Sequence, residues 1–204
     1  MYQLTNMRDI LKSKTNFNPH CIKDPQNIRN LYVGHNNLNF IDFSRFKNLE
    51  SLDIGHNNIN NIENLPISLK WLCVADNPIE DYDRIYDLIN LETLWAHQSN
   101  IDISECFMLK NITHLLIDDC PHICDVSVLE QFTKLNILEA QNNSIENISP
   151  LFGKRLSFLN LMNNNVTDID SLSNMGTLKK LNIRGNLIKN YEPLKTLNLR
   201  RLCL

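Results

Sequence analysis

The chain is poor in glycine and aromatic residues, and it has no strong excess of charge. Only five of its 204 residues are glycine, so a glycine-rich loop that cradles a phosphate is hardly available. The formal net charge of −3 provides no broad basic face, so nucleic acid is not an expected partner. No run is long and apolar enough to cross a bilayer, so we expect no membrane role.

The N-terminal segment also lacks the apolar run of a signal peptide, because polar and apolar residues alternate from Met1 to Lys14. The cysteines have no regular spacing, and several occupy positions that call for a small apolar side chain: Cys21, Cys73, Cys106, Cys120, Cys124 and Cys203. We therefore expect reduced thiols and an intracellular protein, cytoplasmic or nuclear.

No nucleophile, base and orienting acid occur at a recognisable spacing, so we expect no enzyme and no cofactor. His35, His56 and Asp76 follow one another at one phase and could in principle hold zinc. Duplication of a repeat unit explains that spacing more simply. The segment 120–124 contains two cysteines and one histidine but lacks a second ligand pair, so we expect no metal site.

What the sequence does contain is the pattern L-x-x-L-x-L-x-x-N-x-L, which returns at intervals of about 20 to 23 residues. Eight full copies begin at Ile28, Leu49, Leu69, Leu91, Ile112, Leu135, Leu156 and Leu178, and a truncated ninth begins at Leu199. Each unit can bury its apolar face only against its neighbours, which predicts a single elongated domain.

The second copy shows how one unit is expected to fold. Strand side chains alternate between faces, so Leu52 and Ile54 point inward while Ser51 and Asp53 point outward. Asn57 can donate to and accept from backbone groups that the following turn leaves unpaired. The same phase holds Asn36, Asn77, Asn143, Asn164 and Asn186, whereas Ser99 and Cys120 replace asparagine in two copies. We therefore expect these asparagines to be structural.

The second half of each unit has apolar residues at a spacing of three, as in Ile59, Ile62 and Leu65. This spacing predicts short 3₁₀ or single-turn helical segments. The segment 81–91 predicts a fuller helical turn.

These motifs resemble leucine-rich repeats of the 22-residue class, which includes the nuclear regulatory subunit of protein phosphatase 1 and the bacterial internalins. The longest forms of the pattern lie between Leu156 and Leu199. The resemblance implies an α/β fold, a right-handed solenoid with a concave parallel β-sheet and a convex side of 3₁₀ and short helices. It covers residues 28–204.

The ends of such a stack expose its core. Residues 1–27 are expected to form an N-terminal helical cap, because Leu4, Met7, Ile10 and Leu11 have helical spacing. The last strand, beginning at Leu199, has no covering segment in the sequence. We expect mainly a monomer, with a dimer through this open edge as the alternative.

The outward strand positions predict the concave surface. Trp71 and Trp95 fall on adjacent strands, one outward position apart, which is close enough for their rings to meet. Aromatic side chains on an open sheet face are typical interface anchors, and acidic groups beside them favour a basic partner. The predicted binding residues are Tyr32, Asp53, Trp71, Asp76, Trp95, His97, His114, Asp118, Glu139 and Phe158.

The sequence thus indicates a noncatalytic scaffold or regulatory module that binds a protein through its concave face. Two alternatives remain at this stage: a pathogen or viral effector that binds a host protein, and the targeting region of a longer enzyme. Fold alone does not decide among them.

Overall fold

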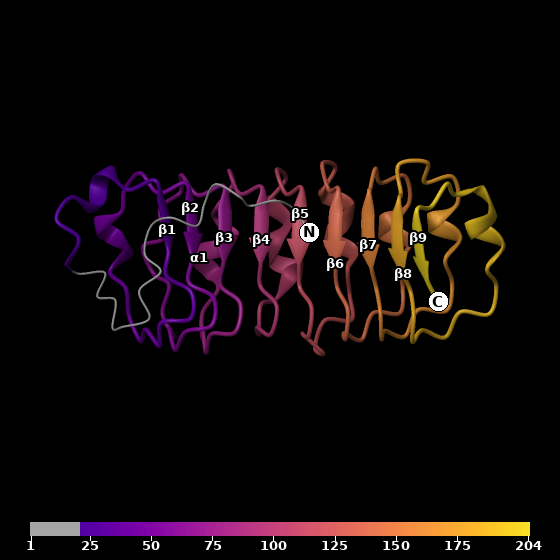
Figure 1. Cartoon of the computed structure of the whole chain (residues 1–204), viewed down its shortest axis with the longest axis horizontal. Coiled ribbons are helices and arrows are strands. Elements are labelled where there is room, and N and C mark those ends of the chain that lie inside the picture. The colour runs from indigo at the N-terminus through magenta and orange to yellow at the C-terminus, as the bar shows by residue number, and fades with distance from the viewer. Residues whose placement is uncertain (1–20) are drawn as a thin grey trace.

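The structure, a computed structural model, describes residues 21–204 and contains one sheet of nine parallel strands (Figure 1). The strands follow one another in sequence order across the sheet. They are β1 (Asn30–Tyr32), β2 (Ser51–Asp53), β3 (Trp71–Cys73), β4 (Thr93–Trp95), β5 (His114–Leu116), β6 (Ile137–Glu139), β7 (Phe158–Asn160), β8 (Lys180–Asn182) and β9 (Arg201–Cys203). Each expected repeat therefore contributes one three-residue strand.

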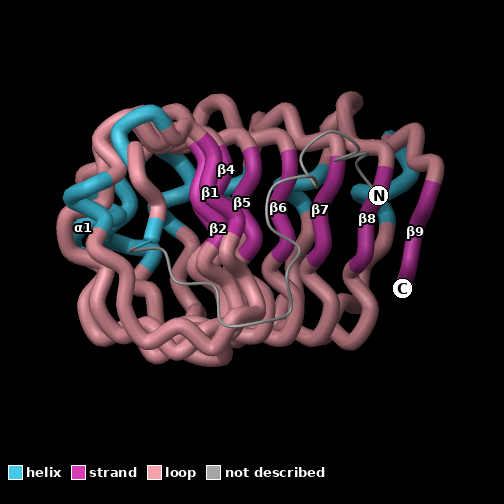
Figure 2. The backbone as a smooth tube through the Cα atoms, turned by 60° about the vertical axis from the view of Figure 1, so that its left-hand side comes forward, coloured by secondary structure: helices cyan, strands magenta, loops and turns pink. Residues whose placement is uncertain are grey.

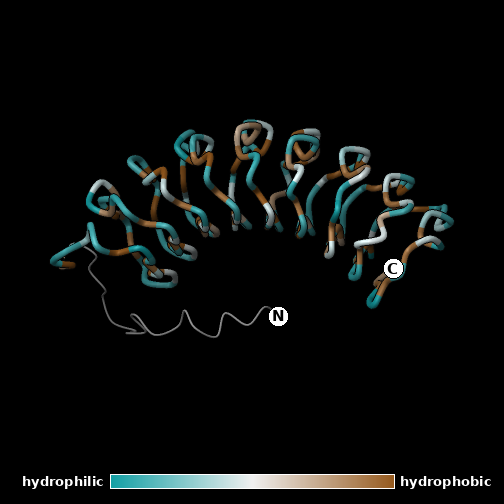
Figure 3. The backbone as a smooth tube through the Cα atoms, turned by 90° about the horizontal axis from the view of Figure 1, so that it is seen from above, coloured by the Kyte–Doolittle hydropathy of each residue, from teal (hydrophilic) through white to brown (hydrophobic). Residues whose placement is uncertain are grey.

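Every strand pairs with the next at the same repeat phase. Tyr32 pairs with Asp53, Asp53 with Cys73 and Cys73 with Trp95, and the same register continues to β9. The sheet curves into an arc with the strands on its inner side (Figure 3), and short helices lie on the opposite side (Figure 2). The predicted solenoid with a concave parallel sheet is confirmed.

The core is a continuous stack of aliphatic side chains. The middle residue of each strand from β1 to β8 is buried, and Leu52, Leu72, Leu94 and Leu115 are at most 1% exposed. They form one cluster with the residues that precede and follow each strand and with the convex segments. Because each repeat contacts only its neighbours, this stack gives the fold its stability.

The convex side consists mainly of single 3₁₀ turns. They are η2 (Pro25–Asn27), η3 (Phe43–Arg45), η4 (Ile103–Met108), η5 (Ser127–Gln131), η6 (Ser149–Leu151), η7 (Asp170–Leu172) and η8 (Glu192–Thr196), with one α-helical turn, α1 (Asp83–Tyr86). The helical turn expected within residues 81–91 is confirmed. The expectation for Ile59–Leu65 is wrong, because this segment forms only turns. Ile59, Ile62 and Leu65 are still at most 2% exposed, so a spacing of three buries these side chains without a helical turn.

The repeated asparagines are structural, as expected, and all of them except Asn36, which bonds within its own repeat, join two repeats. The Asn143 Nδ2 donates to the carbonyls of Ala140, in its own repeat, and of Ile117, in the preceding one, at 3.1 and 2.9 Å. Its Oδ1 accepts from the backbone N–H of Cys120 at 2.8 Å. At the exceptions, Ser99 Oγ donates to Ala96 O at 2.5 Å and Cys120 Sγ donates to Asp118 O at 3.4 Å. Cys120 Sγ also reaches Ala96 O of the preceding repeat at 3.5 Å and lies 3.9 Å from Ser99 Oγ, so the contact between these two repeats is kept with longer bonds.

In all eight full repeats, the residue that precedes the asparagine, or the Ser99 or Cys120 that replaces it, has a left-handed backbone conformation. The residues are His35, His56, Asp76, Gln98, Asp119, Asn142, Asn163 and Gly185, with φ between 49° and 73°. Glycine tolerates this region best, and asparagine, aspartate and histidine are enriched there. We call this row the left-handed column. Its composition follows from backbone geometry.

Gln98 is the member of this column with the least suitable side chain. We expect Gln98→Gly to raise the free energy of unfolding by about 0.5–1 kcal/mol, because a non-glycine residue is strained at φ 53°. Gln98→Val should lower it by about 1–2 kcal/mol. Urea denaturation measures both variants. Asn100→Gly, an exposed control outside the left-handed column, should be destabilising; stabilisation by glycine at both sites would contradict the account.

Within residues 21–204, no helix is long and apolar enough to cross a membrane. The predicted N-terminal cap rests on Leu4, Met7, Ile10 and Leu11, which lie outside the described residues.

Candidate functional site

Three aromatic side chains contact one another on the concave face, over strands β1 to β4. The ring centroids of Trp71 and Trp95 lie 5.1 Å apart with an interplanar angle of 66°. Tyr32 lies 6.0 Å from Trp71 at 68°, so both contacts are edge-to-face. All three side chains are partly exposed. The predicted meeting of the two tryptophan rings is confirmed, and we call Tyr32, Trp71 and Trp95 the aromatic chain.

Asp53 lies beside the aromatic chain, and its own turn holds its carboxylate. The Gly55 N–H donates to Asp53 Oδ1 at 2.9 Å. A Cβ added to Gly34 would lie 3.1 Å from the same carboxylate oxygen, and one added to Gly55 would lie 2.9 Å from Cys73 Sγ. Glycine in these two turns therefore makes room for the side chains of the central column.

Not every outward position is accessible. Ser51, Cys73, Ile137 and Asn160 occupy outward columns, yet each is at most 8% exposed. Burial also raises the pKa of the Cys73 thiol to about 12, and the Asp53 carboxylate adds to this. Strand alternation gives the direction of a side chain but does not show which larger neighbours cover it.

Three histidines and an aspartate lie in the turns that follow strands β1 to β4. The His35 and His56 rings stack at 4.1 Å, and His56 Nδ1 lies 2.9 Å from Asp76 Oδ2. His97 lies 5.7 Å from the His56 ring, and burial lowers its pKa, with His56 adding to the effect. Among the described residues, no three His, Cys, Asp or Glu side chains form a group suited to a metal ion. The left-handed column accounts for His35, His56 and Asp76.

Three acidic side chains approach one another between β5 and β6. Asp118 is half-buried, and burial raises its pKa to about 7. The Gln141 N–H, which donates to Asp118 Oδ1 at 2.8 Å, opposes this shift, while Glu139 and Asp119 reinforce it. Burial also raises the pKa of Glu139. The Asp118 carboxyl group, with its raised pKa, therefore changes its protonation state near neutral pH.

The raised pKa predicts a pH-dependent loss of stability. The folded state holds the Asp118 proton up to about pH 7, whereas the unfolded chain releases it near its ordinary value of 3.8. Stability from this group is thus greatest at low pH and falls as the pH rises from about 4 to 7. We expect Asp118→Asn to be nearly neutral at pH 4 and, after solvent screening, to stabilise the protein by on the order of 2 kcal/mol at pH 8.

Urea denaturation from pH 4 to 8 measures this effect. The exposed Glu146 serves as the control, because Glu146→Gln should leave the pH profile of stability unchanged. Destabilisation by Asp118→Asn at pH 8 would show that the carboxylate is better stabilised in the fold than in water.

The aromatic chain leads into a groove over the C-terminal half of the sheet. This concave groove has a volume of about 610 Å³ and extends from Trp95 on β4 to Arg201 and Cys203 on β9. Its other lining residues are Leu116, Ile137, Glu139, Ser157, Phe158, Asn160, Lys179, Lys180, Leu181 and Asn182. Apolar side chains form much of its surface, and the cations lie at one end.

The structure divides the predicted binding residues into two groups. Tyr32, Asp53 and Trp71 surround the N-terminal aromatic contact, whereas Glu139 and Phe158 line the groove, and Trp95 belongs to both. His114 lies on β5 between them; its Nδ1 is 2.8 Å from Thr113 Oγ1, and burial lowers its pKa.

Asp76, His97 and Asp118 lie beyond the strands, in the turns at their C-terminal ends. The binding prediction omitted Leu116, Ile137, Lys180 and Arg201, although the outward phase and the cluster of positive charges near the C-terminus were visible signals.

No protein-family model matches the chain, and no curated protein sequence matches it. Among solved structures, internalin C2 of Listeria monocytogenes is similar over 87% of this chain and 81% of its own, with 23% identity and a TM-score of 0.79. The chain is a leucine-rich-repeat protein. Both the repeat-by-repeat register and this structural likeness support that assignment.

Other leucine-rich-repeat structures are longer than this protein. Internalin F of Listeria monocytogenes is 26% identical, with a TM-score of 0.73, over 87% of this chain and 61% of its own. The plant peptide hormone receptor RGFR1, solved in complex with RGF2, is 20% identical with a TM-score of 0.56. That match covers 78% of this chain and 32% of the receptor. This protein thus spans less than two thirds of each.

Proposed function

We propose that this leucine-rich-repeat protein is a noncatalytic module that binds another protein on its concave face. The observation that carries the proposal is the aromatic chain, since three aromatic rings lie partly exposed on an open sheet and join a groove. Tryptophan and tyrosine provide large rigid contact areas and are enriched among residues that dominate binding energy. The peptide complex of the plant receptor is an example of protein recognition on the same fold.

A pull-down from lysate of the native cell tests this function. We expect Trp71→Ala/Trp95→Ala to lose at least one partner that the wild type retains, with affinity reduced by at least about tenfold, because each tryptophan anchor contributes on the order of 2 kcal/mol. Circular dichroism verifies that the variant is folded.

The matched control replaces two exposed aromatic residues on the convex side. Phe107 and Phe152 are 50% and 75% exposed, so Phe107→Ala/Phe152→Ala removes a comparable number of aromatic groups. Loss of the same partner with this control, but not with the tryptophan variant, would move the binding site to the convex side.

We further propose an intracellular location, cytoplasmic or nuclear, and a monomeric state. All six cysteines are free, and Cys21 and Cys124 are exposed, which suits a reducing compartment. Size-exclusion chromatography with light scattering should give the mass of one chain. A stable dimer would instead support pairing through the edge of β9.

A further inference from the structure

Two cations lie side by side at one end of the concave groove. Lys180 on β8 and Arg201 on β9 are in register, and both are exposed. Neither forms an ion pair within residues 21–204, whose salt bridges all involve other residues. Like charges directly opposite each other on neighbouring strands are destabilising. An anion placed between them would relieve this repulsion.

The groove beside these cations is apolar. The Lys180 Nζ lies 6.0 Å from the centroid of the Phe158 ring, so the ammonium group lies over the adjoining surface. Phe158 and Leu116 are partly exposed and form the apolar surface that leads toward Trp95, whereas Ile137, which pairs with Phe158, is only 6% exposed. Such a strip favours apolar side chains that leave water.

Glu139 introduces the opposite charge farther along the groove. It is half-buried on β6, next to Leu116 on β5 and Asn160 on β7 in the strand register. No described basic side chain forms an ion pair with it. Along the groove, the cations on β8 and β9 are followed by Phe158 on β7, then by Glu139 on β6, and finally by Leu116 on β5 and Trp95 on β4.

We propose that the concave groove binds an extended peptide with a carboxylate over Lys180 and Arg201, apolar side chains over Phe158, and a basic side chain beside Glu139. This inference rests on the proposed protein-binding function and specifies the chemistry of the partner.

The strand spacing gives the expected separation of the two peptide charges. Strands lie about 4.8 Å apart, and Glu139 is the third residue of β6 whereas Lys180 and Arg201 are the first residues of β8 and β9, so Glu139 is roughly 14 Å from the midpoint between the two cations. An extended chain spans about 3.3 Å per residue, which places the acidic and basic residues about four positions apart, with apolar residues between them.

A polyanion fits this face less well. A nucleic acid carries a charge on every nucleotide, and beyond β8 and β9 its phosphates would meet the carboxylates of Glu139, Asp118 and Asp53. A peptide can confine its negative charge to the basic end and place its other residues on the apolar surface.

Selection from a displayed random heptapeptide library on the immobilised protein tests the proposal. We expect the wild type to enrich peptides in which an acidic and a basic residue, about four positions apart, flank apolar residues. Lys180→Glu/Arg201→Glu should bind these peptides at least tenfold more weakly and should enrich a basic residue in place of the acidic one. Glu139→Gln should relax the requirement for the basic residue only.

Three results would overturn the inference: no enrichment on the wild type, enriched peptides without an acidic residue, or equal binding to the charge-reversed variant. Tighter binding of a single-stranded oligothymidine than of any selected peptide would do the same. The native partner separates the two proposals. If Trp71→Ala/Trp95→Ala loses that partner and Lys180→Glu/Arg201→Glu retains it, concave binding stands and the groove chemistry proposed here is wrong.

Discussion

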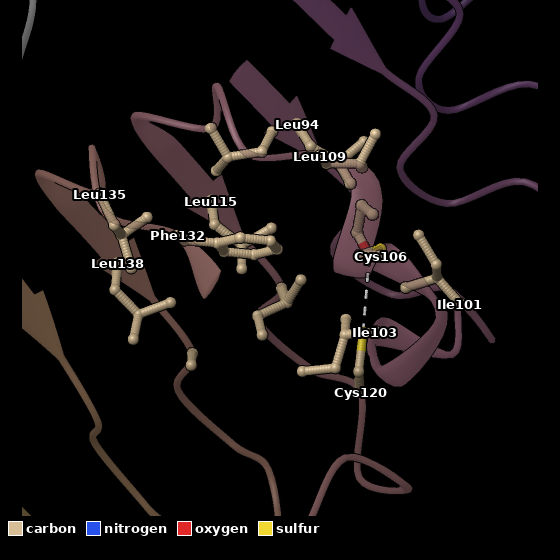
Figure 4. Close-up of a cluster of buried hydrophobic side chains, with 14 of the residues drawn as sticks. Leu94, Ile101, Ile103, Cys106, Leu109, Leu115, Cys120, Phe132, Leu135 and Leu138 are labelled. Atoms are coloured by element: carbon tan, nitrogen blue, oxygen red, sulfur yellow. Dashed lines mark hydrogen bonds between the residues drawn. The ribbon is translucent and has the colours of Figure 1, made fainter. Parts of the chain in front are cut away.

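Phe132→Ala is expected to lower the free energy of unfolding by about 3–5 kcal/mol, because removal of a buried ring leaves a cavity that the core fills only in part. Phe132 is 1% exposed and lies in the cluster with Leu115, Leu135 and Leu138 (Figure 4). It follows η5 on the convex side and packs toward the strands. In a solenoid, this loss weakens the contacts of one repeat with both neighbours.

Phe152 provides a matched control for this substitution. It follows η6 as Phe132 follows η5, yet it is 75% exposed. We expect Phe152→Ala to change stability by less than about 0.5 kcal/mol. Urea denaturation monitored by circular dichroism measures both variants. Similar losses for the two would contradict the packing described for the convex side.

Asn143→Ala is expected to lower the free energy of unfolding by about 3 kcal/mol. The substitution leaves the N–H of Cys120 without its acceptor and the carbonyl of Ile117 without its donor, whereas the carbonyl of Ala140 keeps a second donor, Asn164 Nδ2. Asn143 is only 8% exposed, so water replaces these bonds poorly, and each unsatisfied buried group costs about 1–3 kcal/mol. The effect combines two such groups with partial relaxation.

The control for Asn143 is an asparagine of the neighbouring repeat that is exposed. Asn165 contributes its backbone N–H to Ile145 O, a bond that alanine retains. We expect Asn165→Ala to change stability by less than about 0.5 kcal/mol in the same denaturation experiment. A loss below about 1 kcal/mol for Asn143→Ala would show that the buried asparagines contribute little to the joining of repeats.

The sequence predicted the strand register well because two periodicities acted together. Alternation along a strand determined which side chains point outward, and the repeat phase determined which of them become neighbours. The contact between Trp71 and Trp95 follows from these two facts alone. The buried asparagines were equally predictable, because a turn inside the coil leaves backbone groups that only such a side chain satisfies.

Three features required the structure. Ile59, Ile62 and Leu65 are buried although no helical turn lies between them, so their spacing of three did not distinguish a helical from a nonhelical segment. Burial of Cys73 depends on neighbouring side chains that cover it, which the spacing of apolar residues does not reveal. The concave groove joins side chains from six strands, so its volume depends on the curvature of the whole sheet.

The left-handed backbone conformation of this column was also not predicted from the sequence, although the residue types that favour it were present. His35, His56 and Asp76 suggested a metal site because they recur at one phase. Their shared positive φ gives a backbone reason for the same pattern. Residue types that suit a ligand site also suit a left-handed turn, and the backbone conformation distinguishes the two explanations here.

Photo-crosslinking from opposite faces tests the binding surface most directly. A benzoyl-phenylalanine at Thr93 would lie on the concave face beside Trp71 and Trp95, and one at Phe107 would lie on the convex side. In lysate of the native cell, the account predicts that the Thr93 probe forms a covalent adduct with the partner and that the Phe107 probe does not. An adduct with the same partner from Phe107 alone would contradict binding on the concave face.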